Sequence, residues 1–144
     1  MINGVVGKSY GRNPEQSMAL IRQDKLKIAK KIQKKLELQD HHVGLELGPG
    51  YGWMAKSFAT NCQRLYAADI SETFLKKTKM ECCELDNISL HYLTEFNFDF
   101  LKEDLDFIYS YNVMIHMNAF EIHLMLELAQ RHLRPGGRFW FDIC

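Results

Sequence analysis

A turn with three alternating glycines is the part of the chain whose residue types best suit the binding of a ligand. Gly48, Gly50 and Gly52 directly follow the apolar segment Val43–Leu47, and Glu46 stands two residues before the first glycine. Glycine has no Cβ, so it reaches positive φ at little cost and lets a ligand touch the backbone, although it loses more entropy on folding. The spacing predicts a loop that cradles a cofactor, with a purely structural tight turn as the alternative.

Two other glycine loops do not match this spacing. The dinucleotide fingerprint requires glycine at its first, third and sixth positions, whereas here the sixth position is Trp53 and the extra glycine is at the fifth. The phosphate-binding loop requires a Gly-Lys-Ser/Thr sequence, which does not follow this turn. A nicotinamide-binding domain therefore stays only as an alternative function.

A second acidic residue, Asp69, ends the apolar run 65–68, seventeen residues after Gly52. A carboxylate accepts two hydroxyl donors at once, so this position suits the ribose of a nucleoside cofactor. The alternative role for Asp69 is to cap a helix that we expect to begin near Glu72.

Two further segments follow in chain order: 105–116, which contains Asp106 and Asn112, and 133–139, which contains a Pro-Gly-Gly turn. With the glycine turn and Asp69, they form an ordered set that resembles the class I S-adenosylmethionine-dependent methyltransferases. The resemblance implies S-adenosyl-L-methionine as the cofactor and methyl transfer to a nucleophilic N, O, S or C atom of an acceptor. Because 110–113 reads Ser-Tyr-Asn-Val and not Asn-Pro-Pro-Tyr, a small-molecule acceptor is the better interpretation.

The same resemblance implies a role for each residue of the cofactor site. The glycines would pass beneath the methionine and ribose parts, and Glu46 would orient the methionine ammonium, directly or through water, or else brace the loop. Thr94 and Glu95 are the candidates for the adenine amino group, with the register open by a residue or two. The cofactor-binding residues predicted in this way are Glu46, Gly48, Gly50, Gly52, Asp69, Ile70, Thr94, Glu95 and Asn112.

No catalytic side chain is assigned, because holding donor and acceptor in contact supplies most of the catalysis in such a transfer. His116 is a candidate general base, with a packed or capping histidine as the alternative, and Asn112 is expected at the mouth of the same crevice. Tyr10 is a candidate lid residue, with a loosely ordered terminus as the alternative. No His, Cys or Asp spacing indicates a metal site, and His41 is expected at the far end of the first strand.

Composition excludes several other classes of protein. Eighteen basic and eighteen acidic residues give a formal net charge of zero, so no general attraction for nucleic acid is expected. No run reaches eighteen apolar residues, and the first thirteen residues lack a signal-peptide pattern, so no membrane partner is expected. The four cysteines form no C-x-x-C pair and are interpreted as reduced thiols of a cytoplasmic protein.

Strand and helix patterns alternate along the chain, which predicts an α/β fold with a mostly parallel sheet between helices. The family resemblance implies a Rossmann-like three-layer sandwich with strand order 3-2-1-4-5, so that Gly48 and Asn112 face one crevice. Ser71 and the pair Asn118 and Glu121 are predicted helix caps, and Gly136 a helix terminator. The expected helices are 14–38, 53–60, 72–83 and 119–132, and the expected strands are 43–47, 65–69, 89–93, 106–111 and 138–143.

The helix 14–38 is amphipathic with a basic face. The two interpretations of that face are solvated lysines on a docked helix and a patch for an anionic acceptor or a membrane surface.

The chain is expected to form one domain, 1–144, that stops after the fifth strand and lacks the last two strands usual in the family. The alternative function is therefore an S-adenosylmethionine-binding domain or fragment without turnover of its own. An open fifth strand with large aromatic residues also predicts self-association through that edge.

Overall fold

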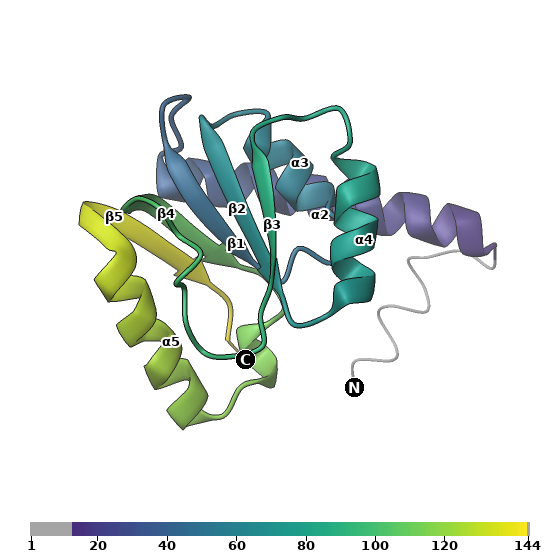
Figure 1. Ribbon diagram of the computed structural model, residues 1–144. Coiled ribbons are helices and arrows are strands. Elements are labelled where there is room, and N and C mark those ends of the chain that lie inside the picture. Colours follow the sequence, from purple (N-terminus) through teal and green to yellow (C-terminus); the bar gives the residue numbers. More distant parts are fainter. Residues whose placement is uncertain (1–12, 144) are drawn as a thin grey trace.

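The computed structural model describes residues 13–143, which fold into a parallel five-stranded sheet between two layers of helices (Figure 1). In strand order the sheet reads β3-β2-β1-β4-β5, and all four pairings are parallel. The elements are α2 (Pro14–Leu36), β1 (Val43–Leu47), α3 (Trp53–Ala59), β2 (Arg64–Asp69), α4 (Glu72–Glu81), β3 (Ile88–Tyr92), β4 (Leu105–Ser110), the 3₁₀ turn η1 (Met114–His116), α5 (Ala119–His132) and β5 (Leu133–Phe141). The α/β class and the strand order predicted from the sequence are confirmed.

The winding of the sheet reverses between β1 and β4, which are neighbours although more than fifty residues separate them. Leu47 is in register with Ser110 on one side and with Ala68 on the other. The carboxyl ends of β1, β2 and β4 therefore lie together, which is where open α/β sheets bind their ligands.

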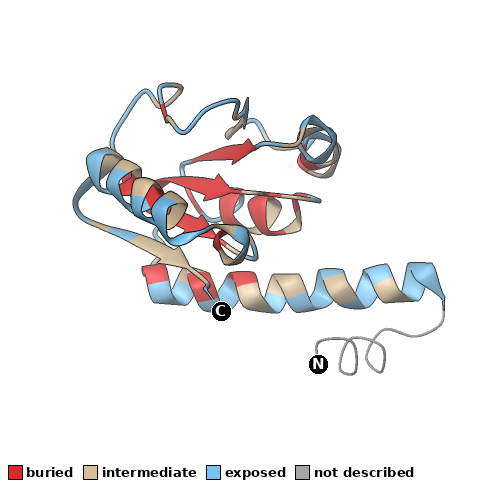
Figure 2. Cartoon of the chain, turned by 90° about the horizontal axis from the view of Figure 1, so that it is seen from below, coloured by how far each residue is buried: buried red, intermediate tan, exposed pale blue. Residues whose placement is uncertain are grey.

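The sheet separates two apolar clusters. Helices α2, α3 and α4 cover one face, where Ile32, Phe58 and Tyr109 are buried. Helix α5, η1 and the segment after β3 cover the other face, where Phe98, Ile108 and Met125 are buried. The buried residues of α2 all lie in its C-terminal half, so its N-terminal half extends past the sheet (Figure 2).

The ends of the helices confirm two predicted caps. The Ser71 hydroxyl accepts a hydrogen bond from the Phe74 N–H, and Asn118 and Glu121 form a reciprocal capping box. Helix α2 ends at Leu36, two residues earlier than expected, because Glu37 takes a left-handed conformation with φ of 52°.

The prediction for Gly136 was wrong. Helix α5 ends at His132 and β5 begins at once with Leu133, five residues before the expected start at 138. Leu133 pairs with Leu105, and pairing resumes at Arg138 after an irregularity. Gly136, with φ of +83°, lies in that irregularity and does not terminate the helix, because the Pro-Gly-Gly sequence bends a strand here.

Among residues 13–143, no helix combines the length and the apolar character that crossing a membrane requires.

Candidate cofactor site

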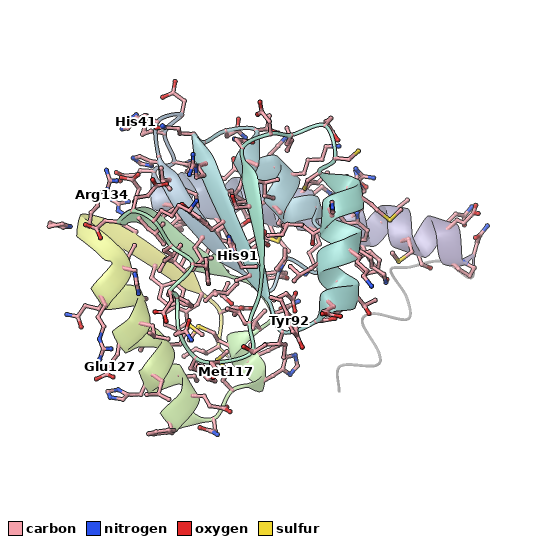
Figure 3. The ribbon with its side chains drawn as sticks, viewed as in Figure 1. His41, His91, Tyr92, Met117, Glu127 and Arg134 are labelled. Atoms are coloured by element: carbon pink, nitrogen blue, oxygen red, sulfur yellow. The ribbon has the colours of Figure 1, made fainter. Side chains whose placement is uncertain are left out.

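A cavity of about 830 Å³ opens at the carboxyl ends of β1, β2 and β4. Its walls include the glycine loop after β1, the end of β2, the segment after β3 and the turn after β4. The starts of α3 and α4, η1, α5 and the N-terminal half of α2 complete them. Met117 lies at this end of the sheet, whereas His41 lies at the opposite end, as expected (Figure 3).

The glycine loop has two functions that the structure separates. Gly48 and Gly50 lie on the cavity wall. Gly52 is buried behind them with φ of +83°, and a Cβ there would lie 2.8 Å from the Thr78 Cα of α4. The loop of Gly50 is tied to the same residue, because the Thr78 hydroxyl donates to the Gly50 carbonyl at 3.0 Å. Gly52 therefore serves the packing of α4 against the loop, and only the first two predicted glycines reach the cavity.

Glu46 is the most unusual group in the cavity wall. It is 3% exposed, and its Oε2 is buried without a hydrogen-bond partner. Burial raises the pKa of Glu46 to about 8, while the neighbouring Tyr109 hydroxyl and the Lys25 ammonium act in the opposite direction. An orphan oxygen of this kind is costly, and a cation bound in the cavity would satisfy it.

Asp69 lies both on the cavity wall and at the start of α4. It is 7% exposed and lines the cavity at the end of β2. Its Oδ1 accepts from the Ser71 N–H at 2.9 Å, while Ser71 itself caps α4. One oxygen thus braces the start of the helix, and the carboxylate stands beside a space where a ligand hydroxyl could be bound.

The remaining predicted residues lie around the rim. The β2 and β3 side of the cavity is lined by Ile70, Thr94 and Glu95. Ile70 is 79% exposed, and the other two residues follow β3. Asn112 and His116 line it on the β4 side. Tyr10 lies outside the described residues.

Asn112 takes a left-handed conformation with φ of 59°, which Asn tolerates better than most residues. Its N–H donates to Asp142 Oδ1 at 2.8 Å, so the turn after β4 is tied to the residue that follows β5. The side chain of Asn112 is therefore presented by a backbone fixed from two strands.

Sequence reasoning missed the wall that α2 contributes. Met18, Ile21 and Lys25 line the cavity, and the Lys25 Nζ lies 4.2 Å from the centroid of the Tyr111 ring. Burial lowers the pKa of Lys25, although Glu46 and Asp142 raise it. These three residues share one side of the helix at i, i+3 and i+7, but the sequence does not say which part of the helix runs beside the sheet. Other wall residues that were not predicted include Tyr51, Trp53, Phe74, Phe96, Tyr111, Met117, Glu121 and Met125.

Within 13–143, no group of three or more His, Cys, Asp or Glu side chains is arranged to hold a metal ion.

Residues 45–137 match the family model described as a methyltransferase domain, and the chain belongs to this family. No curated protein sequence matches the chain significantly. Among solved structures, it is similar to phosphoethanolamine N-methyltransferase 1 of Haemonchus contortus, in complex with phosphoethanolamine and S-adenosylhomocysteine, with a TM-score of 0.76 and 19% identity over 98% of this chain and 31% of that one.

Two further structures show the same fold. The N-methyltransferase NodS of Bradyrhizobium japonicum gives a TM-score of 0.72 and 19% identity over 83% of this chain and 66% of that one. Precorrin 8w decarboxylase of Methanobacterium thermoautotrophicum gives 0.66 and 23% identity over 78% of this chain and 60% of that one. The chain thus spans 31% to 66% of the length of these three proteins.

Proposed function

We propose that this chain binds S-adenosyl-L-methionine and transfers its methyl group to a nucleophilic N, O, S or C atom of a small molecule. The observation that carries the proposal is the placement of two buried carboxylates, Glu46 and Asp69, in the wall of the same cavity as Gly48 and Gly50. Membership of the methyltransferase-domain family supports it. So does the S-adenosylhomocysteine complex of the Haemonchus enzyme, whose fold this chain shares.

The residues present fit such a cofactor. The orphan Oε2 of Glu46 suits an ammonium group, and no atom lies within 4 Å of where a Gly50 Cβ would be, so a ligand can approach this backbone. Asp69, held at one oxygen by Ser71, suits ribose hydroxyls. Ile70, Thr94 and Glu95 line the β2 and β3 side of the cavity and would face the adenine.

When bound, the cofactor supplies an electrophilic methyl carbon, and the chain supplies positioning. Holding the two reactants in near-attack contact accounts for roughly 7 to 11 kcal/mol of a barrier, whereas one general base contributes about 10²- to 10⁴-fold. Asn112 and His116, which line the β4 side of the cavity, are the residues we propose to face the acceptor, with His116 available as a base. Gly52 supports this site only through its packing on α4.

A domain that binds the cofactor without turnover of its own is the second candidate. It is supported by the cavity wall, in which Glu46, Gly48, Gly50 and Asp69 suit the cofactor independently of any acceptor. A cytoplasmic location is also part of the proposal, and the free thiols of Cys62, Cys82 and Cys83 agree with a reducing compartment.

A thermal-shift series tests the proposal, with S-adenosylmethionine, S-adenosylhomocysteine and NAD as separate ligands. At a hundred times its dissociation constant, a ligand adds about 2.7 kcal/mol to the free energy of unfolding. We expect both adenosyl compounds to raise the melting temperature and NAD to leave it unchanged; stabilisation by NAD alone would refute the proposal. A turnover assay on a mixed metabolite pool then separates an active enzyme from a binding domain.

Self-association through β5 is a separate proposal. No further strand of the described residues covers the outer edge of β5, while its side chains Phe139, Trp140 and Phe141 are half-buried under α2 and α5. What β5 exposes is thus the backbone N–H and C=O groups of its outer edge and not its aromatic side chains. Such edges pair with other strands. Sedimentation velocity over a range of concentrations checks this: we expect a rising sedimentation coefficient, and a monomer at every concentration would exclude it.

A further inference from the structure

Behind Glu46 lies a second buried polar atom that has no partner. Tyr109 of β4 is fully buried, and its hydroxyl makes no hydrogen bond within the described residues. Glu46 and Tyr109 are register partners on the neighbouring strands β1 and β4, so both side chains leave the sheet on the same face. Tyr109 does not line the cavity, whereas Glu46 does. The tyrosine therefore reaches a ligand only through the carboxylate.

Packing holds the Tyr109 ring in one position. It stacks on Phe58 of α3 with ring centroids 3.8 Å apart and an interplanar angle of 17°. This packing fixes the ring, and with it the hydroxyl, beside the Glu46 carboxyl. A buried hydroxyl without a partner is rare and calls for an explanation.

Few other charges face Glu46. From α2, Lys25 favours its ionised form, whereas Asp69 at the end of β2 disfavours it. The thiol of Cys82, the residue that follows α4, is also within electrostatic reach of Glu46. Burial outweighs all of these influences and favours the neutral carboxyl.

We propose that Tyr109 is a positioning residue of the cofactor site: its hydroxyl stabilises the ionised form of Glu46, the form that binds the cofactor's ammonium group, and so lowers the cost of the proton release that this binding requires. This inference rests on the proposed function. It goes beyond that function because it assigns a role to a residue outside the cavity and a pH dependence to the affinity.

The direction of the pH dependence follows from the pKa of Glu46. That pKa is about 8 in the free protein, so the carboxyl is mostly neutral at pH 7, while an ammonium ligand binds the carboxylate. Binding below this pKa must release the proton, and the affinity therefore rises with pH by up to about tenfold per pH unit and levels off above it. Burial and the adjacent Glu46 raise the pKa of Tyr109 well above its ordinary value, so Tyr109 keeps its proton throughout and can donate it to the Glu46 carboxylate.

Isothermal titration of the full chain with S-adenosylhomocysteine, over about pH 6 to 9 and in buffers of different ionisation enthalpy, tests the inference. For the wild type we expect close to one proton released per ligand at pH 7. Glu46→Gln has no carboxyl to lose this proton, so any proton release that remains in the variant measures titration of the ligand itself and is subtracted. Tyr109→Phe, which keeps the stacked ring, should bind up to about tenfold more weakly at pH 7, because one pKa unit corresponds to a factor of ten, and should approach the wild type at the highest pH.

Each outcome of these titrations either supports the inference or overturns it. A Tyr109→Phe variant weakened by the same factor at every pH has only a structural defect, and one that binds like the wild type shows no coupling; either result overturns the inference. A wild-type chain that binds the ligand without releasing a proton overturns it even if the Phe variant does not fold, and leaves the proposed function standing. A wild-type chain that binds no S-adenosylhomocysteine at any pH removes both.

Discussion

The two sides of the cavity are built in different ways. The wall formed by the glycine loop and the ends of β1 and β2 is mostly backbone, with Gly48 in a left-handed conformation and Glu46 and Asp69 buried beside it. The wall formed by α2 is made of side chains on a helix whose N-terminal half has no buried residue; Met18 there is 36% exposed. The first wall is thus fixed by the sheet, and the second depends on how one helix docks.

The polar contacts of the two walls differ in the same sense. Asp69 and Ser71 are two residues apart and share a hydrogen bond at the start of α4. By contrast, α2 is held over the cavity by long-range contacts, the Arg22–Glu81 ion pair at 2.6 Å and the Lys25 ammonium over the Tyr111 ring. Exposed ion pairs contribute little to stability. Changes in the first wall should therefore affect folding strongly, and changes in the second should affect it weakly.

The largest effect is expected from Glu46→Gln. The folded-state pKa of Glu46, about 8, lies above its ordinary value of 4.5, so its neutral form stabilises the fold fully below pH 4.5 and this contribution is lost as pH rises toward 8. Relative to wild type, the variant should gain about 2 to 5 kcal/mol in unfolding free energy between pH 5 and pH 8. Urea unfolding at several pH values measures this. The exposed control Asp86→Asn should show a flat difference, and a flat difference for Glu46→Gln would contradict the prediction.

Gly52→Ala should have the second largest effect on the free energy of unfolding. At φ of +83°, with the new Cβ 2.8 Å from the Thr78 Cα, the substitution combines backbone strain with a clash against main chain. We expect a loss of about 2 to 4 kcal/mol in the free energy of unfolding. Gly50→Ala is the matched control: it also has positive φ, but nothing lies within 4 Å of its Cβ, so it should lose only about 1 to 2 kcal/mol. Equal losses in urea titrations would mean that the contact with α4 is not rigid.

Asp69→Ala should weaken S-adenosylhomocysteine binding by about 1 to 3 kcal/mol, because it removes a buried acceptor. The same change removes the hydrogen bond to the Ser71 N–H. Asp69→Asn keeps an oxygen for that bond and loses only the charge, so it separates the bracing of α4 from ligand binding. Calorimetric titration of both variants with S-adenosylhomocysteine measures the two affinities. An unchanged affinity for Asp69→Ala would mean that Asp69 only braces the helix.

The contrast between the walls also explains how much the sequence could reveal. Glu46, Gly48 and Asp69 were predicted because strand ends and glycine spacing are local patterns, and parallel pairing brings strand ends together. Lys25 was missed because its position depends on how α2 crosses the sheet, which no local pattern encodes. The start of β5 at Leu133 was missed for a related reason: its pairing with Leu105 is a long-range contact around an irregularity, and the local sequence resembles a turn.

The smallest effect on stability is expected from Lys25→Met, which keeps the apolar stem and removes the charge over the Tyr111 ring. A cation over an aromatic ring contributes about 0.5 to 1 kcal/mol at such a partly exposed site, and the desolvation that lowers the pKa of Lys25 offsets part of it. We therefore expect a loss of unfolding free energy no greater than about 1 kcal/mol. Lys27→Met, on the exposed side of the same helix, is the control and should change it less. Because Lys25 favours the ionised form of Glu46, its removal should also shift the pH dependence of S-adenosylhomocysteine binding to higher pH, whereas Lys27→Met should not. A stability loss as large as that of Gly52→Ala would show that α2 is fixed to the cavity as firmly as the glycine loop, and the distinction between the two walls would fail.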